Sequence, residues 1–369
     1  MCRVFTPGMV CYAMHKVRVY AENNQRIITE RKTVSSVEEF WYKKTAAVPI
    51  GYRLMATIFR ILAFLRRVSF TWLFFRTYRS PVPVIVVGNI TVGGSGKTPV
   101  VVWLVNLLKK HDFKPGIVSR GYGGKADSWP QQVRPDSDPN VVGDEAILLA
   151  RRSNCPMAVG PNRPAAVKAL LQHTDVDIII SDDGMQHYAL ERDIEIAVID
   201  GQRRFGNGLF LPAGPLREPL SRLRKVDFRI NNGGKLEPYE MPMNLQMNRV
   251  INVCKPSVTK NIEDFKGKSV HAVAGIGNPG RFFDQLIRQG ITLIKHPFSD
   301  HHLFAKEDVL FKDEMPVLMT QKDAVKCERF DNKNLWYVSV SAIMKPELEK
   351  GIIEMVNKVR INARGKHGC

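Results

Sequence analysis

Apolar and polar residues alternate in blocks from about residue 81 to residue 230. Short apolar runs of strand length are separated by segments in which apolar residues recur at helical spacing. We expect strands at 82–87, 116–119, 157–159, 177–181, 195–200 and 227–230, and helices at 100–110, 144–152 and 163–173. Because the strands are apolar at successive positions, helices should cover both faces of the sheet. The pattern therefore predicts an α/β domain with a mostly parallel sheet over residues 81–240.

The pattern starts again after the polar sequence Asn-Asn-Gly-Gly at 231–234. Apolar residues alternate over 243–253, as in a strand with one covered face, and further strands are expected near 269–274, 292–295 and 317–320. A chain of 369 residues commonly holds two domains. We therefore assign residues 241–369 to a linker strand and a second, smaller α/β domain.

Residues 39–80 are rich in large apolar and aromatic side chains. Arg53, Arg60 and Arg67 recur every seven residues, so on a helix they share one side. Pro49 suits the start of such a helix. An apolar helix with aromatic residues and a basic stripe, interrupted too often by charge to span a bilayer, favours the plane of a membrane interface. A helix packed on the protein's own core is the alternative reading.

Residues 1–38 are polar and mixed in charge, without periodicity. We expect a poorly ordered extension there and attach no function to it; Met14 is a second candidate start. The first thirty residues lack the apolar core of a secretory signal. No stretch approaches the roughly 18 uncharged apolar residues of a spanning helix.

The net charge of +18 indicates an anionic partner, which can be a nucleic acid, a phosphorylated substrate or an acidic membrane. The six cysteines lie far apart and form no Cys-x-x-Cys pair. They are typical of isolated thiols in a reducing compartment and not of a disulfide framework or a zinc site.

A glycine-rich sequence joins the first expected strand to the first expected helix. It reads Thr91-Val92-Gly93-Gly94-Ser95-Gly96-Lys97-Thr98. Glycines allow backbone N–H groups to surround phosphate oxygens, and the start of a helix adds positive potential. In such a phosphate loop Lys97 reaches the β- and γ-phosphates of a nucleotide and Thr98 binds Mg²⁺. Thr91 stands where the common form of the loop has its first glycine.

A carboxylate at the end of a second apolar strand is the expected partner of this loop. Asp182 and Asp183 end the stretch Val-Asp-Ile-Ile-Ile-Ser-Asp-Asp at 176–183. We expect them to hold Mg²⁺, directly or through water, and leave open which of them binds it.

A phosphate loop predicts nucleotide binding and leaves the reaction open. Partitioning-type ATPases, which also use amphipathic membrane helices, carry an extra lysine where this chain has Val92. A GTPase would need Asn-Lys-x-Asp to recognise its base, and the nearest sequence, at 320–323, places Lys322 directly beside Asp323. A membrane-recruited ATPase that acts through protein partners remains the alternative function.

Further polar motifs follow in a fixed order along the chain. They are Ser-Arg-Gly-Tyr-Gly-Gly at 119–124, Val-Gly-Asp-Glu at 142–145, Asp-Asp-Gly-Met-Gln-His at 182–187, Pro-Ala-Gly-Pro-Leu-Arg-Glu-Pro at 212–219, Asp-His-His at 300–302 and Lys-Asp-Ala-Val-Lys at 322–326. Together with the phosphate loop, this ordered set closely resembles the tetraacyldisaccharide 4′-kinases of Gram-negative lipid A synthesis. The resemblance extends from about residue 40 to near residue 360.

The resemblance implies transfer of the ATP γ-phosphate to the 4′-hydroxyl of a tetraacyldisaccharide 1-phosphate. It also implies two α/β domains with the active site in the cleft between them. The amphipathic segment would meet the cytoplasmic face of the inner membrane, as a peripheral or monotopic protein does. An acceptor that is a phosphorylated lipid accounts for both the apolar helix and the basic excess. We expect no nucleic-acid partner and infer no obligate protein partner.

The resemblance also assigns roles to single residues. Asp144 alone would be an ordinary helix-cap carboxylate, but the family pattern makes it the group that takes the acceptor's proton. His301 is the expected partner that orients it, with His302 as a lesser alternative. Arg217 and Glu218 match a motif near the phosphates or Mg²⁺, although they could also form an ordinary surface ion pair without a role in the site.

Three further features are less specific. Arg120 and Tyr122, in a second glycine-rich loop, suit either the acceptor or the nucleotide, or form a plain surface turn. His187 could indicate a carboxylate–histidine metalloenzyme, but the phosphate loop favours a structural or substrate contact. The sequence Gly-Ile-Gly-Asn-Pro at 275–279 is weak evidence for a second nucleotide site.

Overall fold

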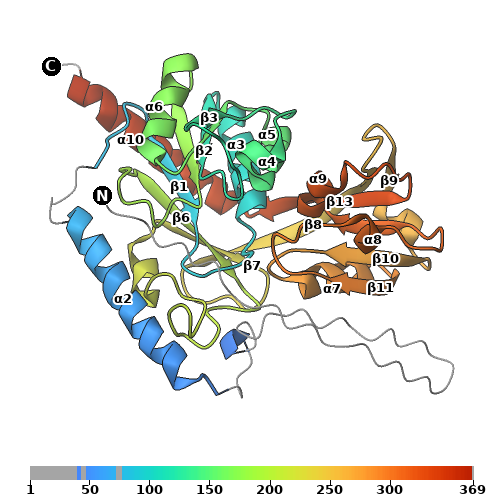
Figure 1. Ribbon diagram of the computed structural model, residues 1–369. Helices are drawn as coiled ribbons and strands as arrows, with labels where there is room; N and C mark the ends of the chain where they lie inside the picture. The colour runs from blue at the N-terminus through green and yellow to red at the C-terminus, as the bar shows by residue number, and fades with distance from the viewer. Residues whose placement is uncertain (1–39, 43–46, 72–76, 368–369) are drawn as a thin grey trace. The chain divides into compact units, whose positions relative to one another are not determined.

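The computed structural model describes residues 40–42, 47–71 and 77–367, and a thirteen-stranded sheet is its central feature (Figure 1). The strands are β1 (Val84–Gly88), β2 (Pro115–Ser119), β3 (Gln131–Gln132), β4 (Met157–Val159), β5 (Ile178–Asp182), β6 (Ile194–Asp200), β7 (Phe228–Asn232), β8 (Glu240–Asn252), β9 (Thr259–Asn261), β10 (Ser269–Ala274), β11 (Thr292–Pro297), β12 (Val317–Thr320) and β13 (Leu335–Met344). The described helices are α2 (Ile50–Thr71), α3 (Lys97–Lys110), α4 (Pro139–Val142), α5 (Asp144–Ser153), α6 (Arg163–His173), α7 (Pro279–Arg288), α8 (Lys306–Val309), α9 (Gln321–Cys327) and α10 (Pro346–His367), with 3-10 turns η1 (Leu220–Lys225) and η2 (Ile262–Phe265).

The order of strands across the sheet is β11-β10-β12-β13-β8-β7-β6-β1-β5-β2-β4-β3, with β9 paired to β8. Neighbouring strands are parallel except in the pairs β3–β4, β8–β9 and β8–β13. The expected α/β class with a mostly parallel sheet is thus confirmed. Every strand predicted from the pattern corresponds to a strand of the sheet, with ends that differ by a few residues.

Helices cover both faces of the strands around β1, as the continuous apolar runs predict. Ile85 and Val87 pack into a core formed with α3, α5 and α10. Val84 and Val86 point to the other face and pack with α6. Alternation along a strand sends successive side chains to opposite faces, so a strand buried on both must be apolar throughout.

The strands β10 to β13 are covered in the same way. Phe282 and Phe283 of α7 pack with Val270 and Ala272 on one face of β10. On the other face Ala324 of α9 packs in a separate core with strand residues of β10 and β12. Strand β8 pairs with β7 on one side and β13 on the other, and so joins this group of strands to the group around β1.

The sequence pattern gave no prediction for β13 and α10. The register of β13 is fixed by antiparallel pairing with β8, a contact distant in sequence that local patterns do not report. The buried side of α10 is formed by Leu348, Ile352 and Val356, four residues apart and therefore on one helix face.

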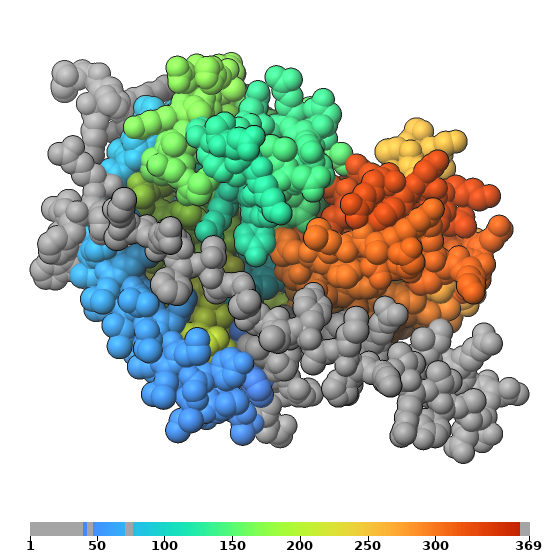
Figure 2. Space-filling model, viewed as in Figure 1, coloured from blue at the N-terminus to red at the C-terminus, as the bar shows by residue number. Residues whose placement is uncertain are grey.

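The predicted amphipathic helix is α2, which begins directly after Pro49. Residues 39, 43–46 and 72–76 of the predicted segment 39–80 lie outside the described residues, as does the extension 1–38. Most of the large apolar side chains of α2, the helix drawn in blue in Figure 2, are exposed. They are Ile50, Leu54, Met55, Ile58, Ile61, Leu62, Phe64 and Leu65. Among the described residues, no helix is both long enough and apolar enough to cross a bilayer.

The inner side of α2 carries small residues, basic residues and the half-buried aromatic residues Tyr52, Phe59 and Phe70. Ala56 is buried, and the Arg60 guanidinium lies 5.9 Å from the centre of the Phe210 ring. Arg53 and Arg60 line a cavity of about 740 Å³ between α2 and the segment 207–213. The arginines therefore flank the apolar face of α2 on the side toward the protein.

Candidate active site

The phosphate loop connects β1 to α3 at the carboxyl edge of the sheet, where α/β folds bind their ligands. Gly93 and Gly96 have φ values of 101° and 94°, which residues with a side chain rarely adopt. A Cβ atom on Gly96 would also clash with the Asn232 amide. Helix α3 begins at Lys97, so Lys97 and Thr98 stand in its first turn, as the sequence predicts for a phosphate loop.

Side chains from two strand ends hold the loop in shape. The Asn232 amide nitrogen donates to the Ser95 carbonyl at 2.9 Å, and the Asn89 amide donates to the Ser95 hydroxyl at 3.2 Å. Val92 donates its backbone N–H to the Pro215 carbonyl at 2.8 Å. The Asn-Asn-Gly-Gly sequence was interpreted only as the boundary between two patterns, so Asn232 was not predicted as a site residue. Its position at the end of a buried strand could have indicated this role, because ligands bind at the carboxyl ends of such strands.

Asp183 lies between two cations of the predicted site. One carboxylate oxygen is 3.4 Å from the Lys97 ammonium and the other is 3.1 Å from the Arg217 guanidinium. Burial acts to raise the pKa of Asp183, but Lys97 and Arg217 outweigh it and hold this pKa well below the usual range. Asp183 is therefore an anion that orients the phosphate-loop lysine.

Asp182 has a different environment. It is buried, and burial together with the neighbouring Asp183 charge raises its pKa to about 7. Its Oδ1 atom is buried without a hydrogen-bond partner among the described residues. A cation would supply that partner and favour the ionised form, so the carboxylate suits Mg²⁺.

The described residues contain no group of three or more His, Cys, Asp or Glu side chains arranged to hold a metal ion. In a phosphate-loop site Mg²⁺ is held mostly by phosphates and water with one or two carboxylates. The alternative of a carboxylate–histidine centre would use His187. Burial and the charges of Arg163 and Arg120 lower the pKa of His187 to about 3, so its ring is neutral.

Glu218 is placed otherwise than expected for a direct metal ligand. One of its oxygens accepts from the Gln186 amide at 2.7 Å. The other accepts from the Tyr188 hydroxyl at 2.6 Å and lies 3.3 Å from the Arg222 guanidinium. Both oxygens are thus occupied by protein donors in a buried position, an arrangement suited to holding the segment 186–188 beside the loop.

A second cluster of charged groups surrounds Asp144, the first residue of α5. Its Oδ1 atom lies 3.8 Å from the His301 ring nitrogen Nδ1, and its Oδ2 atom lies 3.4 Å from the Lys326 ammonium. Burial acts to raise the pKa of Asp144, but His301, Lys322 and Lys326 together outweigh it and lower the pKa far below the usual range. The structure thus places His301, the expected partner, at ion-pair distance from Asp144.

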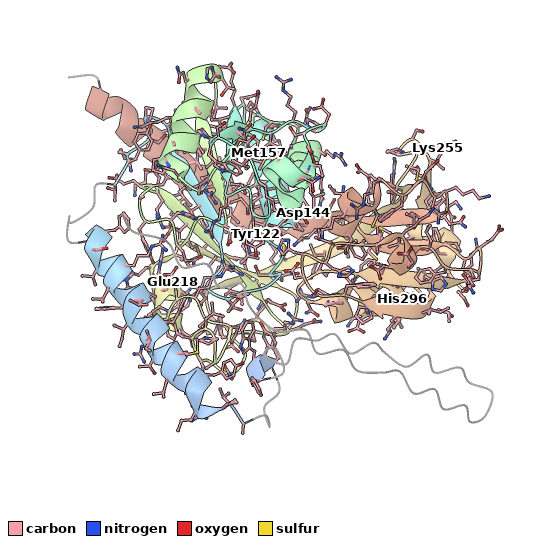
Figure 3. The ribbon with its side chains drawn as sticks, in the orientation of Figure 1. Tyr122, Asp144, Met157, Glu218, Lys255 and His296 are labelled. Atoms are coloured by element: carbon pink, nitrogen blue, oxygen red, sulfur yellow. The ribbon has the colours of Figure 1, made fainter. Side chains whose placement is uncertain are left out.

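Residues around this pair fix its orientation. The His301 ring packs against Tyr122 at a centroid distance of 4.7 Å, and Figure 3 shows Tyr122 close to Asp144. Lys322 lies 2.8 Å from Glu145 and 2.9 Å from Asp300, and it approaches His301 Nε2 at 3.3 Å.

His302, the lesser candidate, does not approach Asp144. Its Nε2 atom pairs with Asp308 at 3.0 Å, and its ring stacks on Phe298. The sequence analysis assigned no role to Lys322 or Lys326. Their spacing of four residues, which places both on one face of a helix, could have indicated that they act at the same site.

The site geometry can be compared with known proteins. The model of the family described as tetraacyldisaccharide-1-P 4′-kinase matches residues 51–357. A tetraacyldisaccharide 4′-kinase of Nitrosococcus oceani is 48% identical over 326 residues, which are 88% of this chain and 95% of the relative. One from Photobacterium profundum is 51% identical over 286 residues, covering 77% and 82% of the two chains. A crystal structure of LpxK from Aquifex aeolicus in complex with ATP is similar with a TM-score of 0.66 and 26% identity, over 82% of this chain and 97% of that one.

Proposed function

Because the chain belongs to the tetraacyldisaccharide-1-P 4′-kinase family, we propose that it transfers the γ-phosphate of ATP to the 4′-hydroxyl of a tetraacyldisaccharide 1-phosphate. The product is the bisphosphorylated lipid A precursor. The observation that carries this proposal within the molecule is the strand–phosphate loop–helix unit whose Lys97 is oriented by Asp183. Family membership disfavours the alternative of an ATPase that acts only through protein partners.

The phosphate loop would bind the phosphates of ATP. Its backbone N–H groups and the start of α3 offer positive potential to anionic oxygens. Lys97 would stabilise the charge that develops on the transferred phosphoryl group, and Arg217, held by the same carboxylate, would assist from the other side.

Thr98 and the Asp182–Asp183 pair are the residues we propose for Mg²⁺. The ion would neutralise charge on the phosphate oxygens when bound. Asp182, with its unpaired oxygen, is favoured for the closer contact, while Asp183 is already engaged by Lys97 and Arg217. Glu218 would support this region through its hydrogen bonds to Gln186 and Tyr188.

Asp144 would act on the acceptor side of the reaction. Its carboxylate is held ionised by neighbouring cations, so it can accept the proton that the attacking hydroxyl loses. His301 would orient this carboxylate and share the incoming proton. Asp144 comes from a loop and helix start separate from the strand end that carries Asp182 and Asp183, which suits separate duties toward acceptor and metal.

Helix α2 would bring the enzyme to its lipid acceptor. Its outward side presents a continuous row of exposed apolar side chains, with Leu54, Ile58 and Leu62 each more than half exposed. Arginines flank that row, as in helices that lie in an anionic membrane interface. The proposed location is the cytoplasmic face of the bacterial inner membrane.

A direct assay tests the function. The purified protein is incubated with ATP, Mg²⁺ and a detergent-dispersed acyl disaccharide 1-phosphate, and the lipid is analysed by mass spectrometry and ³¹P NMR. We expect a lipid that has gained one phosphate at the 4′ position, and no gain when ATP is omitted. Hydrolysis of ATP without phosphorylation of the lipid would contradict the proposal and favour the ATPase alternative.

A further inference from the structure

The glycine-rich loop at 275–279, between β10 and α7, lies directly against the phosphate loop. Gly277 is buried, and a Cβ atom placed on it would overlap the Gly94 nitrogen and lie 3.2 Å from the Gly93 Cα atom. Conversely, a Cβ atom on Gly94 would lie 3.7 Å from the Gly277 nitrogen. The two backbones are therefore in contact, and a side chain at Gly277 has no room, whereas a Cβ atom on Gly94 would make only an ordinary contact.

A buried ion pair holds the 275–279 loop in this position. The guanidinium of Arg281, in the first turn of α7, forms a short contact with Asp200 at the end of β6. Both side chains are nearly buried, with 12% and 7% of their surface exposed. Asp200 also accepts backbone N–H groups from Gln202 and Arg203 at 3.0 and 3.1 Å.

The Asn278 side chain adds to the same anchor. It caps α7 by accepting the Arg281 N–H at 3.3 Å, and its amide nitrogen lies 3.5 Å from Asp200. Strand β6 is the direct neighbour of β1 in the sheet, and β1 leads into the phosphate loop. The anchor thus fixes the 275–279 loop relative to the strand that supports the phosphate loop.

We propose that the 275–279 loop is part of the ATP site and that Arg281 is the residue that positions it. Held by Asp200, Arg281 keeps Gly277 against Gly93 and Gly94, and this contact maintains the loop conformation that binds the ATP phosphates. The inference rests on the proposed kinase function. It assigns the glycine-rich sequence to the same nucleotide site as the phosphate loop instead of to a second one.

The physical reason is the precision that phosphate binding requires. A phosphate loop binds through backbone N–H groups, so its affinity depends on where the backbone lies. Displacement of reacting or binding groups by about 1 Å can cost on the order of a hundredfold in rate. A side chain introduced at Gly277 has to displace Gly93 and Gly94, because backbone atoms cannot rotate away.

Two alanine variants provide a matched test. Gly277→Ala introduces the overlap with the phosphate loop, whereas on exposed Gly280, in the first turn of α7, a Cβ atom would meet nothing closer than Asn278 Oδ1 at 3.6 Å. Binding of the non-hydrolysable analogue AMP-PNP with Mg²⁺ is measured by calorimetry on the full chain. We expect Gly277→Ala to weaken binding roughly tenfold or more, and Gly280→Ala to bind like the unchanged protein.

Arg281→Met and Arg281→Lys test the anchor. We expect Arg281→Met to raise the KM for ATP with little change in the KM for the lipid, and Arg281→Lys to recover part of the loss. Arg151→Met is the control, because Arg151, in the last turn of α5, forms its ion pair with Glu328 at the end of α9. Thermal unfolding of each variant separates loss of ATP affinity from loss of the fold.

The outcomes separate the inference from the function on which it rests. Normal AMP-PNP affinity in a folded Gly277→Ala protein would overturn the inference, as would equal losses in Arg281→Met and Arg151→Met. ATP binding by the unchanged protein without transfer to lipid would overturn the proposed function alone. Absence of ATP binding by the unchanged protein would overturn both.

Discussion

Asp182 and Asp183 are neighbours in sequence, yet their surroundings move their pKa values in opposite directions. Lys97 and Arg217 hold Asp183 ionised, while burial and the Asp183 charge raise the pKa of Asp182 to about 7. Asp182 is the last residue of β5, whereas Asp183 follows the strand with a φ of 48°, so the two carboxylates at one edge meet different partners. This division supports Asp183 as the partner of the lysine and Asp182 as the group completed by Mg²⁺.

Replacing Lys97 with alanine tests the phosphate loop. The ammonium is 3.4 Å from Asp183 and only partly exposed, so its loss removes a preorganised positive charge from the phosphate site. We expect phosphoryl transfer to fall roughly several hundred-fold, equivalent to about 3–4 kcal/mol of transition-state stabilisation. Steady-state kinetics measures the loss, and circular dichroism checks the fold. A folded Lys97→Ala enzyme with near-normal turnover would remove the argument from the loop.

Asp144 and His301 are tested as a pair. Asp144→Asn keeps the size of the side chain but removes the base, so kcat should fall roughly 10²–10⁴-fold with only a modest change in the KM for ATP. His301→Ala should lose less. If the two residues act as a unit, the double variant loses less than the product of the single losses. Strictly multiplicative losses would argue against the partnership, and a nearly active Asp144→Asn enzyme would place the base elsewhere.

Lys326 should control the acidic side of the pH profile. Its ammonium lies 3.4 Å from Asp144 and contributes to the lowered pKa of that carboxyl, so Asp144 stays ionised as the pH falls. Lys326→Met removes this charge, and the pKa of Asp144 should rise. We therefore expect the acidic limb of kcat to move to higher pH, while Lys326→Arg should keep it near its original place. Identical profiles for the Met variant and the unchanged enzyme would show that the charge has no such role.

Some residues of the site could be predicted from local sequence motifs, and others could not. Lys97, Thr98, Asp182 and Asp183 stand within motifs whose residue types and spacing carry the chemistry. Asn232 and Lys326 meet the loop and Asp144 only after the sheet has formed, from positions well over a hundred residues away. For Glu218 the motif alone was misleading. It predicts a position near the phosphates or Mg²⁺, but the structure shows that both carboxylate oxygens accept hydrogen bonds from Gln186 and Tyr188.

At the scale of elements, strands buried on both faces were predictable because their apolar runs are local. β1 and β5, for example, are buried along their whole length. Strand β13 has a mixed burial pattern, and its place depends on pairing with β8 about 90 residues earlier. Helix α2 was predicted as an element, but which of its sides faces outward depended on the packing of Ala56 and Arg60.

Helix α2 should mediate binding to anionic vesicles. Changing Arg53, Arg60 and Arg67 to glutamate should weaken binding, since each basic residue near such a surface contributes roughly 1 kcal/mol. ATP binding should change little. Sedimentation with phosphatidylserine-containing vesicles at physiological salt measures the effect. Full sedimentation of the triple variant would mean that the arginines act within the protein and not at the membrane.

The outward side of α2 is tested separately. Replacing Leu54, Ile58 and Leu62 with serine removes apolar surface that is already exposed, so the fold should tolerate the change. Vesicle binding should fall because burying such a side chain in an apolar environment is worth roughly 1.5–3 kcal/mol. Leu236→Ser, another exposed apolar position far from α2 in sequence, is the control and should bind normally. Unchanged binding by the α2 variant would contradict insertion of this side.

At the scale of the whole molecule, α10 near the C-terminus completes the core around β1. Leu348, Ile352 and Val356 of α10 are fully buried in the same cluster as α3 and α5. Near the active site, Lys322 and Lys326 of α9 reach Asp144 and Glu145 of α5. Core and site therefore both join segments from distant parts of the sequence, which makes catalytic geometry dependent on folding of the C-terminal third.

Ile352→Ala tests this dependence. The side chain is fully buried in the core that supports β1 and the phosphate loop, so truncation leaves a cavity and should lower the free energy of unfolding by about 2–5 kcal/mol. Ile361→Ala, on the same helix but 69% exposed, should change it little. Denaturant unfolding of both variants, followed by tryptophan fluorescence and by AMP-PNP binding, measures the effect. Because α10 closes the core beneath the phosphate loop, the two probes should shift together in Ile352→Ala. If tryptophan fluorescence reported unfolding of Ile352→Ala while AMP-PNP binding was retained, the core around β1 would be stable without α10.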